Sequence, residues 1–126
     1  MADDDVTLPW APVDKGQDVR AYFDAKTREY LRRVISQGVI DEHRRNPHAQ
    51  YRSEALTRLM FYFKNLPAEE QYALRAMPDG TYRVSEFPRG RHRPRVVEDT
   101  PLATPEDGLH AIFLRKLNDL MEKNDG

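Results

Sequence analysis

The clearest structural signal in the chain is the segment TPEDGLHAIFLRKLNDLM, residues 104–121. Thr104 suits the N-cap position of a helix, Pro105 suits the first helical position, and the two acidic residues that follow suit the positive end of the helix dipole. An apolar stripe then recurs at helical spacing, at Leu109, Ile112, Phe113, Leu117 and Leu120. Leu114 and Met121 widen the stripe beyond the ~100° of an ordinary amphipathic helix. We therefore expect this helix to be buried against more than one surface.

Two further helices are predicted on the N-terminal side of this segment. The first spans roughly residues 17–36, where apolar side chains recur near the helical period, and Gly38 is expected to stop it. Residues 39–45 could add a turn or two before Asn46-Pro47. The second helix begins after Ser53, a good N-cap, and ends at Pro67. Its apolar stripe comprises Leu56, Leu59, Met60 and Phe63.

A β-hairpin and two irregular segments complete the predicted fold. The turn Pro78-Asp79-Gly80 separates two runs, 72–77 and 81–87, of which the second alternates polar and apolar residues. Residues 88–103 contain four Pro or Gly residues and predict a long irregular loop, whereas Pro9 and Pro12 predict an extended arm over residues 1–16. The expected class is α+β, mainly α, with three helices and one hairpin between helices two and three. Residues 17–126 are expected to form a single small domain.

Composition excludes several classes of protein. The chain has 126 residues and no cysteine, so disulfide frameworks, thiolate metal sites and cysteine nucleophiles are excluded. The longest apolar run, residues 59–63, is far shorter than the ~20 residues of a membrane-spanning helix. The acidic start Asp3-Asp4-Asp5 does not resemble a signal peptide. We therefore expect a cytoplasmic protein without a membrane partner, and the net charge of −1 excludes a globally basic nucleic-acid coat.

No catalytic or metal-binding residue is assigned from the sequence. The four histidines, His43, His48, His92 and His110, show no metal-ligand spacing, and no serine lies in a nucleophile elbow. His110 is expected to pack at the start of its helix, within reach of Asp107, with a ligand or catalytic role as the less favoured alternative. The run Phe61-Tyr62-Phe63 is expected to pack in the core rather than to line a ligand site.

An arginine-rich stretch is the main electrostatic feature. Five arginines and one glutamate give a local charge of +4 between residues 83 and 95. Such a stretch can bind RNA phosphates, or it can bind an acidic protein surface. We favour the protein surface, because no aromatic residue lies between Pro88 and Ala103 to stack on bases and because four carboxylates follow, at Glu98, Asp99, Glu106 and Asp107.

Seven residues are accordingly predicted to form a partner interface: Trp10, Arg89, Arg91, Arg93, Arg95, Leu114 and Met121. Trp10 is the only tryptophan and lies on the predicted arm. A large indole is costly to leave in water, so it is expected in a groove of its own domain or, alternatively, in a neighbouring chain.

Several local strings carry a resemblance to a known family. They are residues 28–31 (REYL), 40–47 (IDEHRRNP), 56–59 (LTRL), 62–67 (YFKNLP) and 104–117 (TPEDGLHAIFLRKL). Together they span roughly residues 20–120, and over this range the chain resembles the small, light-chain subunit of N,N-dimethylformamidase. None of the strings is a catalytic signature, since each is explained by helix capping and packing.

The resemblance implies an accessory chain bound to a much larger catalytic chain, which carries a mononuclear iron held by tyrosines and a glutamate and hydrolyses a small amide. No catalytic residue and no cofactor is placed on the present chain, whose own enzymatic role stays open. The alternative is a free-standing nucleic-acid-binding or regulatory module that uses the arginine-rich stretch 83–95. Whether the amide is dimethylformamide or another small amide is open.

Overall fold

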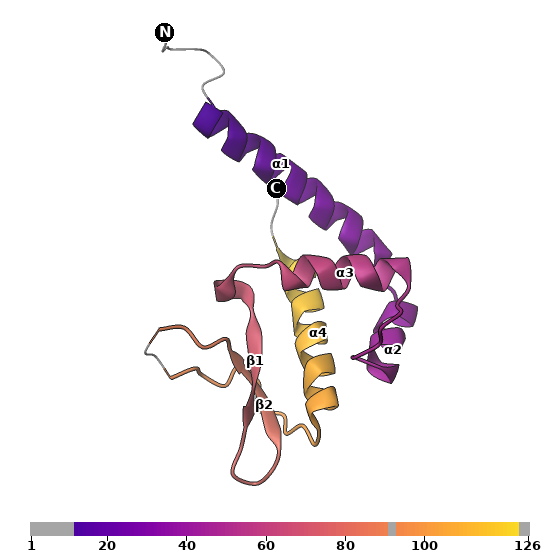
Figure 1. Cartoon of the computed structure of the whole chain (residues 1–126), viewed down its shortest axis with the longest axis vertical. Coiled ribbons are helices and arrows are strands. Elements are labelled where there is room, and N and C mark those ends of the chain that lie inside the picture. Colours follow the sequence, from indigo (N-terminus) through magenta and orange to yellow (C-terminus); the bar gives the residue numbers. More distant parts are fainter. Residues whose placement is uncertain (1–11, 91–92, 124–126) are drawn as a thin grey trace.

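The computed structural model describes residues 12–90 and 93–123 (Figure 1). Its elements, in chain order, are α1 (Pro12–Val34), α2 (Gln37–Arg45), α3 (Glu54–Lys64), the 3-10 turn η1 (Ala68–Glu70), β1 (Tyr72–Ala76), β2 (Tyr82–Glu86) and α4 (Pro105–Glu122). The described part of the chain is thus a mixed fold of four α-helices and a two-stranded hairpin. None of its helices is long and apolar enough to cross a membrane.

The prediction of three helices is wrong, because residues 37–45 form a helix of their own. The Ser36 hydroxyl accepts a hydrogen bond from the Val39 amide (3.2 Å) and so caps the start of α2. Gly38, expected to end the first helix, lies inside α2. The hairpin therefore lies between α3 and α4, the third and fourth helices of the fold.

Helix α1 also begins earlier than expected. It starts at Pro12, so residues 12–16, which were predicted to be extended, are helical. Proline is compatible with the first position of a helix, where no intrahelical partner for an N–H is needed. Trp10 and the rest of residues 1–11 lie outside the described residues.

The hairpin forms where the turn residues predicted it. Strands β1 and β2 pair antiparallel, with Tyr72 opposite Glu86 and Ala76 opposite Tyr82. Gly80 adopts a φ of +86°, which glycine tolerates best. The second half of the loop 88–103 then runs back along the outer edge of β2, where the Tyr82 amide donates to Leu102 O (2.8 Å) and the Val97 amide to Val84 O (2.9 Å).

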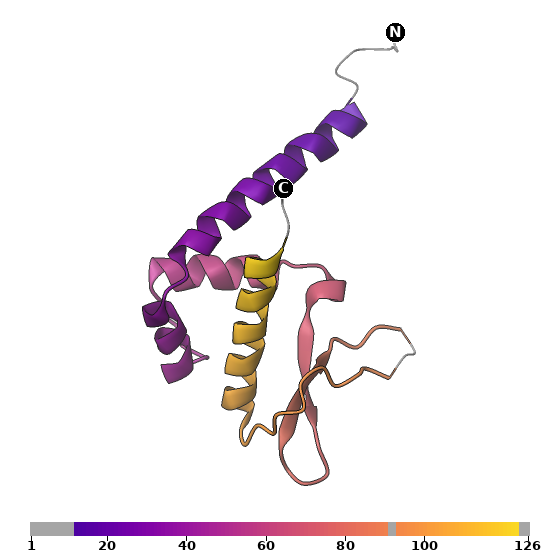
Figure 2. The same ribbon diagram turned by 180° about the vertical axis from the view of Figure 1, so that it is seen from behind.

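The core lies around α4, which runs between the other helices and the hairpin (Figures 1 and 2). Its buried apolar residues come from all four helices: Leu31, Val39, Leu56, Leu59, Phe63, Phe113, Leu117 and Leu120. The predicted apolar stripe of α4 is therefore confirmed for Phe113, Leu117 and Leu120.

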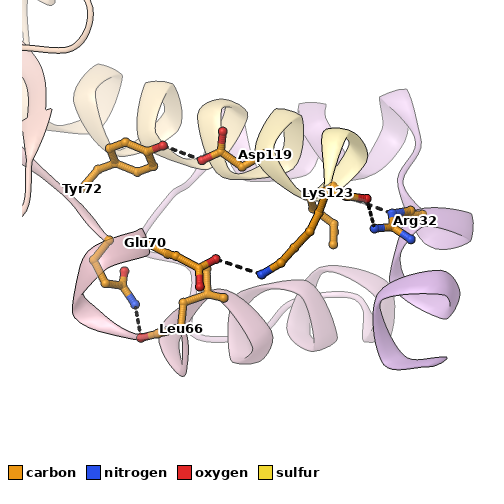
Figure 3. Close-up of polar contacts among 8 residues, drawn as sticks. Arg32, Leu66, Glu70, Tyr72, Asp119 and Lys123 are labelled. Carbon is orange, nitrogen blue, oxygen red and sulfur yellow. Dashed lines mark hydrogen bonds and ion pairs between the residues drawn. The ribbon is translucent and has the colours of Figure 1, made fainter. Parts of the chain in front are cut away.

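Both ends of α4 are held by side chains. At the start, the Thr104 hydroxyl accepts a hydrogen bond from the Asp107 amide (3.1 Å), as predicted. At the end, Arg32 of α1 donates to the Leu120 and Lys123 carbonyl oxygens, both at 2.9 Å (Figure 3). The C-terminal end of α1 is thereby joined to α4, whereas the N-terminal half of α1 extends away from the rest of the fold (Figures 1 and 2).

Candidate interaction surface

A large groove lies between α1 and α3. Its volume is about 890 Å³, and it is lined by α1 residues between 23 and 31, by α3 residues between 57 and 62 and by residues of the segment 65–70 that follows α3. Glu70 and Lys123, which also line it, form an ion pair of 3.2 Å (Figure 3). We call this feature the α1–α3 groove.

The walls of the α1–α3 groove are aromatic and uncovered. Phe23 is 61% exposed, Phe61 is 70% exposed and Tyr30 is 40% exposed, whereas Leu31 at the same groove is buried. Contiguous exposed apolar surface of this kind is uncommon on soluble monomers and marks binding sites.

Charged side chains line the rim of the α1–α3 groove. Four are cationic (Lys26, Arg28, Arg58 and Lys123) and two are anionic (Asp24 and Glu70). Arg58 lies 5.7 Å from the Tyr30 ring centroid and is bonded to Glu54 at 2.7 Å, and Lys26 contacts Glu29 at 3.5 Å. The groove is thus lined by exposed aromatic rings together with charged side chains, and the cations Lys26, Arg58 and Lys123 form ion pairs within the chain.

The α4 residues predicted for the interface are on the surface of the described structure. Leu114 is 36% exposed and Met121 is 55% exposed, and since they are seven residues apart they lie on one face of α4. Leu114 borders a hollow of about 400 Å³ together with Arg44, Leu102 and Glu106. Neither Leu114 nor Met121 lines the α1–α3 groove, so this α4 face is a separate surface.

Three of the predicted arginines surround another hollow, of about 580 Å³. Arg89, Arg93 and Arg95 line it, and Arg91 lies outside the described residues. Arg95 forms an ion pair with Glu86 (3.2 Å), and its hydrogen bonds lower the pKa of that carboxyl group. Arg83 does not join this group, because it is half-buried in β2 and donates to the Thr81 hydroxyl (2.6 Å).

The carboxylates that follow the arginines have other partners. Glu98 forms an ion pair with Arg115 (3.0 Å), and Glu106 lies 3.4 Å from His48. Among the described residues, the carboxylate paired with an arginine of the loop is therefore Glu86, the partner of Arg95.

Two buried histidines join α2 to α4. The Nδ1 atoms of His43 and His110 are 2.9 Å apart, and the two residues are only 2% and 6% exposed. His43 also stacks on Phe113, with ring centroids 4.1 Å apart. The expected contact of His110 with Asp107 is thus replaced by a hydrogen bond to His43.

Burial lowers the pKa of both imidazoles. Desolvation, followed by the neighbouring His110 and Arg52, lowers the pKa of His43 to about 4, and desolvation followed by Arg44 lowers the pKa of His110. Both rings are therefore neutral near pH 7, and one Nδ1–H donates to the other Nδ1. The pair packs as part of the core.

The resemblance implies an iron site on the larger chain and none on this chain. No group of three His, Asp or Glu side chains among the described residues is placed to hold a metal ion. Tyr72 donates to Asp119 (2.5 Å; Figure 3), but the Arg115 guanidinium lies 5.1 Å from the Tyr72 ring, and a cation at this position disfavours a second cation. Burial, then the bond to Asp119, also raises the pKa of Tyr72 and so disfavours the phenolate.

The α1–α3 groove was missed by the sequence reasoning, although a signal for it was present. Successive residues of an α-helix are rotated by ~100° around its axis, so Phe61 points ~160° away from Phe63 and ~140° away from Leu56 around α3. Since Leu56 and Phe63 are buried, Phe61 must point outward. The expectation that all of Phe61-Tyr62-Phe63 packs in the core is therefore wrong for Phe61.

Comparison with known proteins places the chain in a family. Residues 18–126 match the family model described as N,N-dimethylformamidase alpha subunit. The chain is 33% identical over 120 residues to the N,N-dimethylformamidase alpha subunit of Paracoccus aminophilus, covering 91% of this chain and 84% of the relative. It is 26% identical over 112 residues to the protein of the same name from Alcaligenes sp., covering 85% and 84% of the two chains. The chain belongs to the N,N-dimethylformamidase alpha subunit family.

Proposed function

We propose that this chain is a non-catalytic accessory subunit of an N,N-dimethylformamidase-like, iron-dependent amidohydrolase. The active site lies on a larger partner chain in the cytoplasm, and the complex hydrolyses a small amide, such as dimethylformamide, to an amine and a carboxylate. Membership of the alpha subunit family supports this proposal, since its name denotes one subunit of an enzyme.

The observation that carries the proposal is the uncovered α4 face. Leu114 and Met121 are exposed although they lie on the central helix of the fold. Apolar side chains at such a position gain free energy when a partner covers them, at ~25 cal/mol per Å² of apolar surface removed from water. The large chain therefore binds across the α4 face, and the arginines at 89, 93 and 95, which surround a separate hollow, supply further polar contacts.

The chemistry of amide hydrolysis agrees with an active site on the large chain and an accessory role for this chain. Amide hydrolysis requires an activated water and an electrophile for the developing oxyanion, and a metal ion can supply both. The proposal places the iron on the partner, as the resemblance implies. What this chain contributes is the stability and solubility of the large chain.

Co-purification tests the proposal. With an affinity tag on this chain, co-expression with the large chain encoded beside it should yield a tight hetero-oligomer. Metal analysis after separation of the chains should find the iron with the large chain. If this chain purifies alone, or if it carries stoichiometric iron when expressed by itself, the proposal fails.

A further inference from the structure

Lys116 is a partly buried amine of α4 that the proposed function leaves without a role. Its Nζ atom donates to Gln71 Oε1 at 2.6 Å, and among the described residues it forms no ion pair. Lys123, at the end of the same helix, is instead paired with Glu70. A buried ammonium is normally paired with a carboxylate, because moving an unpaired charge out of water is costly. The environment of Lys116 is therefore unusual for a charged lysine.

Gln71 is held so that its amide oxygen faces Lys116. The Gln71 Nε2 atom donates to Phe63 O at 2.9 Å and to Leu66 O at 3.0 Å, at the C-terminal end of α3 and just beyond it. The amide group is thereby fixed by its nitrogen, and its oxygen is left for the lysine. An amide oxygen accepts a hydrogen bond from a neutral amine as well as from an ammonium. The contact therefore positions the Lys116 amine without requiring it to be charged.

Burial favours the neutral form of this amine. Desolvation lowers the pKa of Lys116 from its ordinary value of 10.5. The Phe63 ring centroid lies 5.9 Å from Nζ, at the outer limit of a cation–π contact, so it opposes this effect only weakly. The neutral amine has the lone pair that attacks an electrophile, and desolvation in an apolar environment is one way in which proteins activate lysine as a nucleophile.

A hollow of about 180 Å³ lies beside Lys116, where α2, α3 and α4 meet. Its walls are mainly apolar and include Met60, Phe63, Leu109, Ile112 and Phe113. Since Phe63 is one of these walls, the contact of Nζ with its ring places the amine at the edge of the hollow. The described lining contains no carboxylate, and Lys64 is its other cation. A hollow of this size and polarity suits a small, uncharged molecule.

We propose that Lys116 is a nucleophilic amine that binds a small aldehyde in this hollow as a reversible imine. The Nζ lone pair forms a bond to the carbonyl carbon, and the C–O bond then breaks as the C=N bond forms. The carbonyl oxygen leaves as water with the two protons of the neutral amine, so the step requires no oxidant, reductant or further reactant. The inference goes beyond the proposed function, because it concerns a small ligand of this chain rather than its contact with the large chain.

Reductive trapping tests the proposal on the full chain. Propanal is added at pH 7 with cyanoborohydride, which reduces an imine to a stable alkylamine, and peptide mass spectrometry follows the rate at each lysine. Lys116 should be alkylated several-fold faster than Lys64, an exposed lysine of the same hollow, although Lys116 is the less accessible of the two. Its rate should also saturate with propanal concentration, as expected for a binding site. Labelling of Lys116 that is no faster than that of Lys64 overturns the proposal.

Two tryptophan variants separate the hollow from general changes in α4. Ile112→Trp fills the hollow and should slow the labelling of Lys116 at least ~10-fold, while Lys64 stays unchanged. Asn118→Trp is the matched control, since Asn118 is exposed on α4 outside the hollow, and it should leave the rate at Lys116 unchanged. Urea unfolding confirms that both variants are folded. Equal labelling of Lys116 in the two folded variants would show that the hollow binds no aldehyde, and the inference would then fail.

Discussion

At the scale of single residues, the His43–His110 pair is a buried contact whose contribution to the stability of the fold depends on pH. The two Nδ1 atoms are 2.9 Å apart, so the hydrogen bond requires one ring to donate and the other to accept. The charged groups that act on the pair are Arg52 on His43, and Arg44, Asp107 and Asp41 on His110. Protonation of both rings would place two N–H groups against each other inside the core.

We predict that acid destabilises the fold through this pair. The pKa of His43 is about 4 in the folded chain against an ordinary value of 6.5, so between these values the unfolded chain binds more protons. The contribution of the neutral His43 ring to the free energy of unfolding is complete above pH 6.5 and is lost as the pH falls towards 4. Between pH 7.5 and pH 5 the free energy of unfolding should fall by about 2 kcal/mol, measured by urea titration. A free energy of unfolding that stays flat between pH 7.5 and pH 5 would contradict the account of the pair.

The sequence predicted that His110 is packed, but not its partner. His43 and His110 are 67 residues apart, and local spacing contains no information about a contact across that separation. Asp107 was the nearest plausible partner along the helix. The actual partner is fixed by the packing of α2 against α4.

At the scale of elements, α4 packs closely against β1 at a glycine. Gly108 is buried in the first turn of α4, and a Cβ atom built on it would lie 2.5 Å from Leu74 Cδ1 and Cδ2. Glycine in a helix costs ~1 kcal/mol relative to alanine. Packing against the hairpin therefore explains why α4 has glycine at this position.

We predict that Gly108→Val destabilises the fold by ~1–3 kcal/mol, because the added side chain must displace Leu74. Thermal or urea unfolding measures the loss. Gly38→Ala is the matched control, since Gly38 lies in α2 with only the Ser36 hydroxyl within 4 Å, at 3.7 Å, and this change should be neutral or stabilising by up to ~1 kcal/mol. The account of the α4–β1 contact is wrong if Gly108→Val is as stable as the unmodified chain.

Elements with strong end signals were predictable. Ser53, Thr104 and the turn at Gly80 placed α3, α4 and the hairpin correctly. The separate helix α2 was missed because the helical period continues through residues 34–40, so the Ser36 cap was not recognised. Helix propensity along the sequence does not show whether a serine such as Ser36 lies inside one long helix or caps the start of a second one.

At the scale of the whole molecule, the exposed α4 face is predicted to bind the large chain. Leu114→Asp or Met121→Asp should weaken co-purification with the large chain, and Met121→Asp, at a 55% exposed side chain, should change the free energy of unfolding by no more than ~0.5 kcal/mol. Phe61→Asp, in the α1–α3 groove, should leave co-purification intact. Equal co-purification of all three variants would remove the α4 face from the interface.

The arginine-rich loop gives a prediction about nucleic acid. One of its arginines is paired with Glu86 and Arg83 is held within β2, so binding to mixed single-stranded RNA should be no tighter than the ~10⁻⁴–10⁻⁶ M of nonspecific contacts at physiological salt. Fluorescence anisotropy with a labelled RNA measures it. Salt-sensitive binding tighter than this range would favour the nucleic-acid-binding alternative.

The sequence indicated part of these surfaces. Leu114 and Met121 were identified because they widen the apolar stripe of one helix, and such a stripe can be read from a single stretch of sequence. The α1–α3 groove combines residues 23–31 with residues 57–67, and only the tertiary packing of α1 on α3 brings them together. Trp10 and Arg91 lie outside the described residues, so their part in an interface stays a prediction.

Reconstitution of amide hydrolysis from separated chains tests the central claim most directly. Increasing amounts of this chain are added to a fixed amount of the large chain, and formate release from dimethylformamide is followed together with the half-life of activity. We predict that this chain alone releases no formate, and that activity or half-life of the large chain rises and saturates at a fixed ratio of the two. A large chain that is equally soluble, stable and active without this chain would contradict the accessory-subunit account.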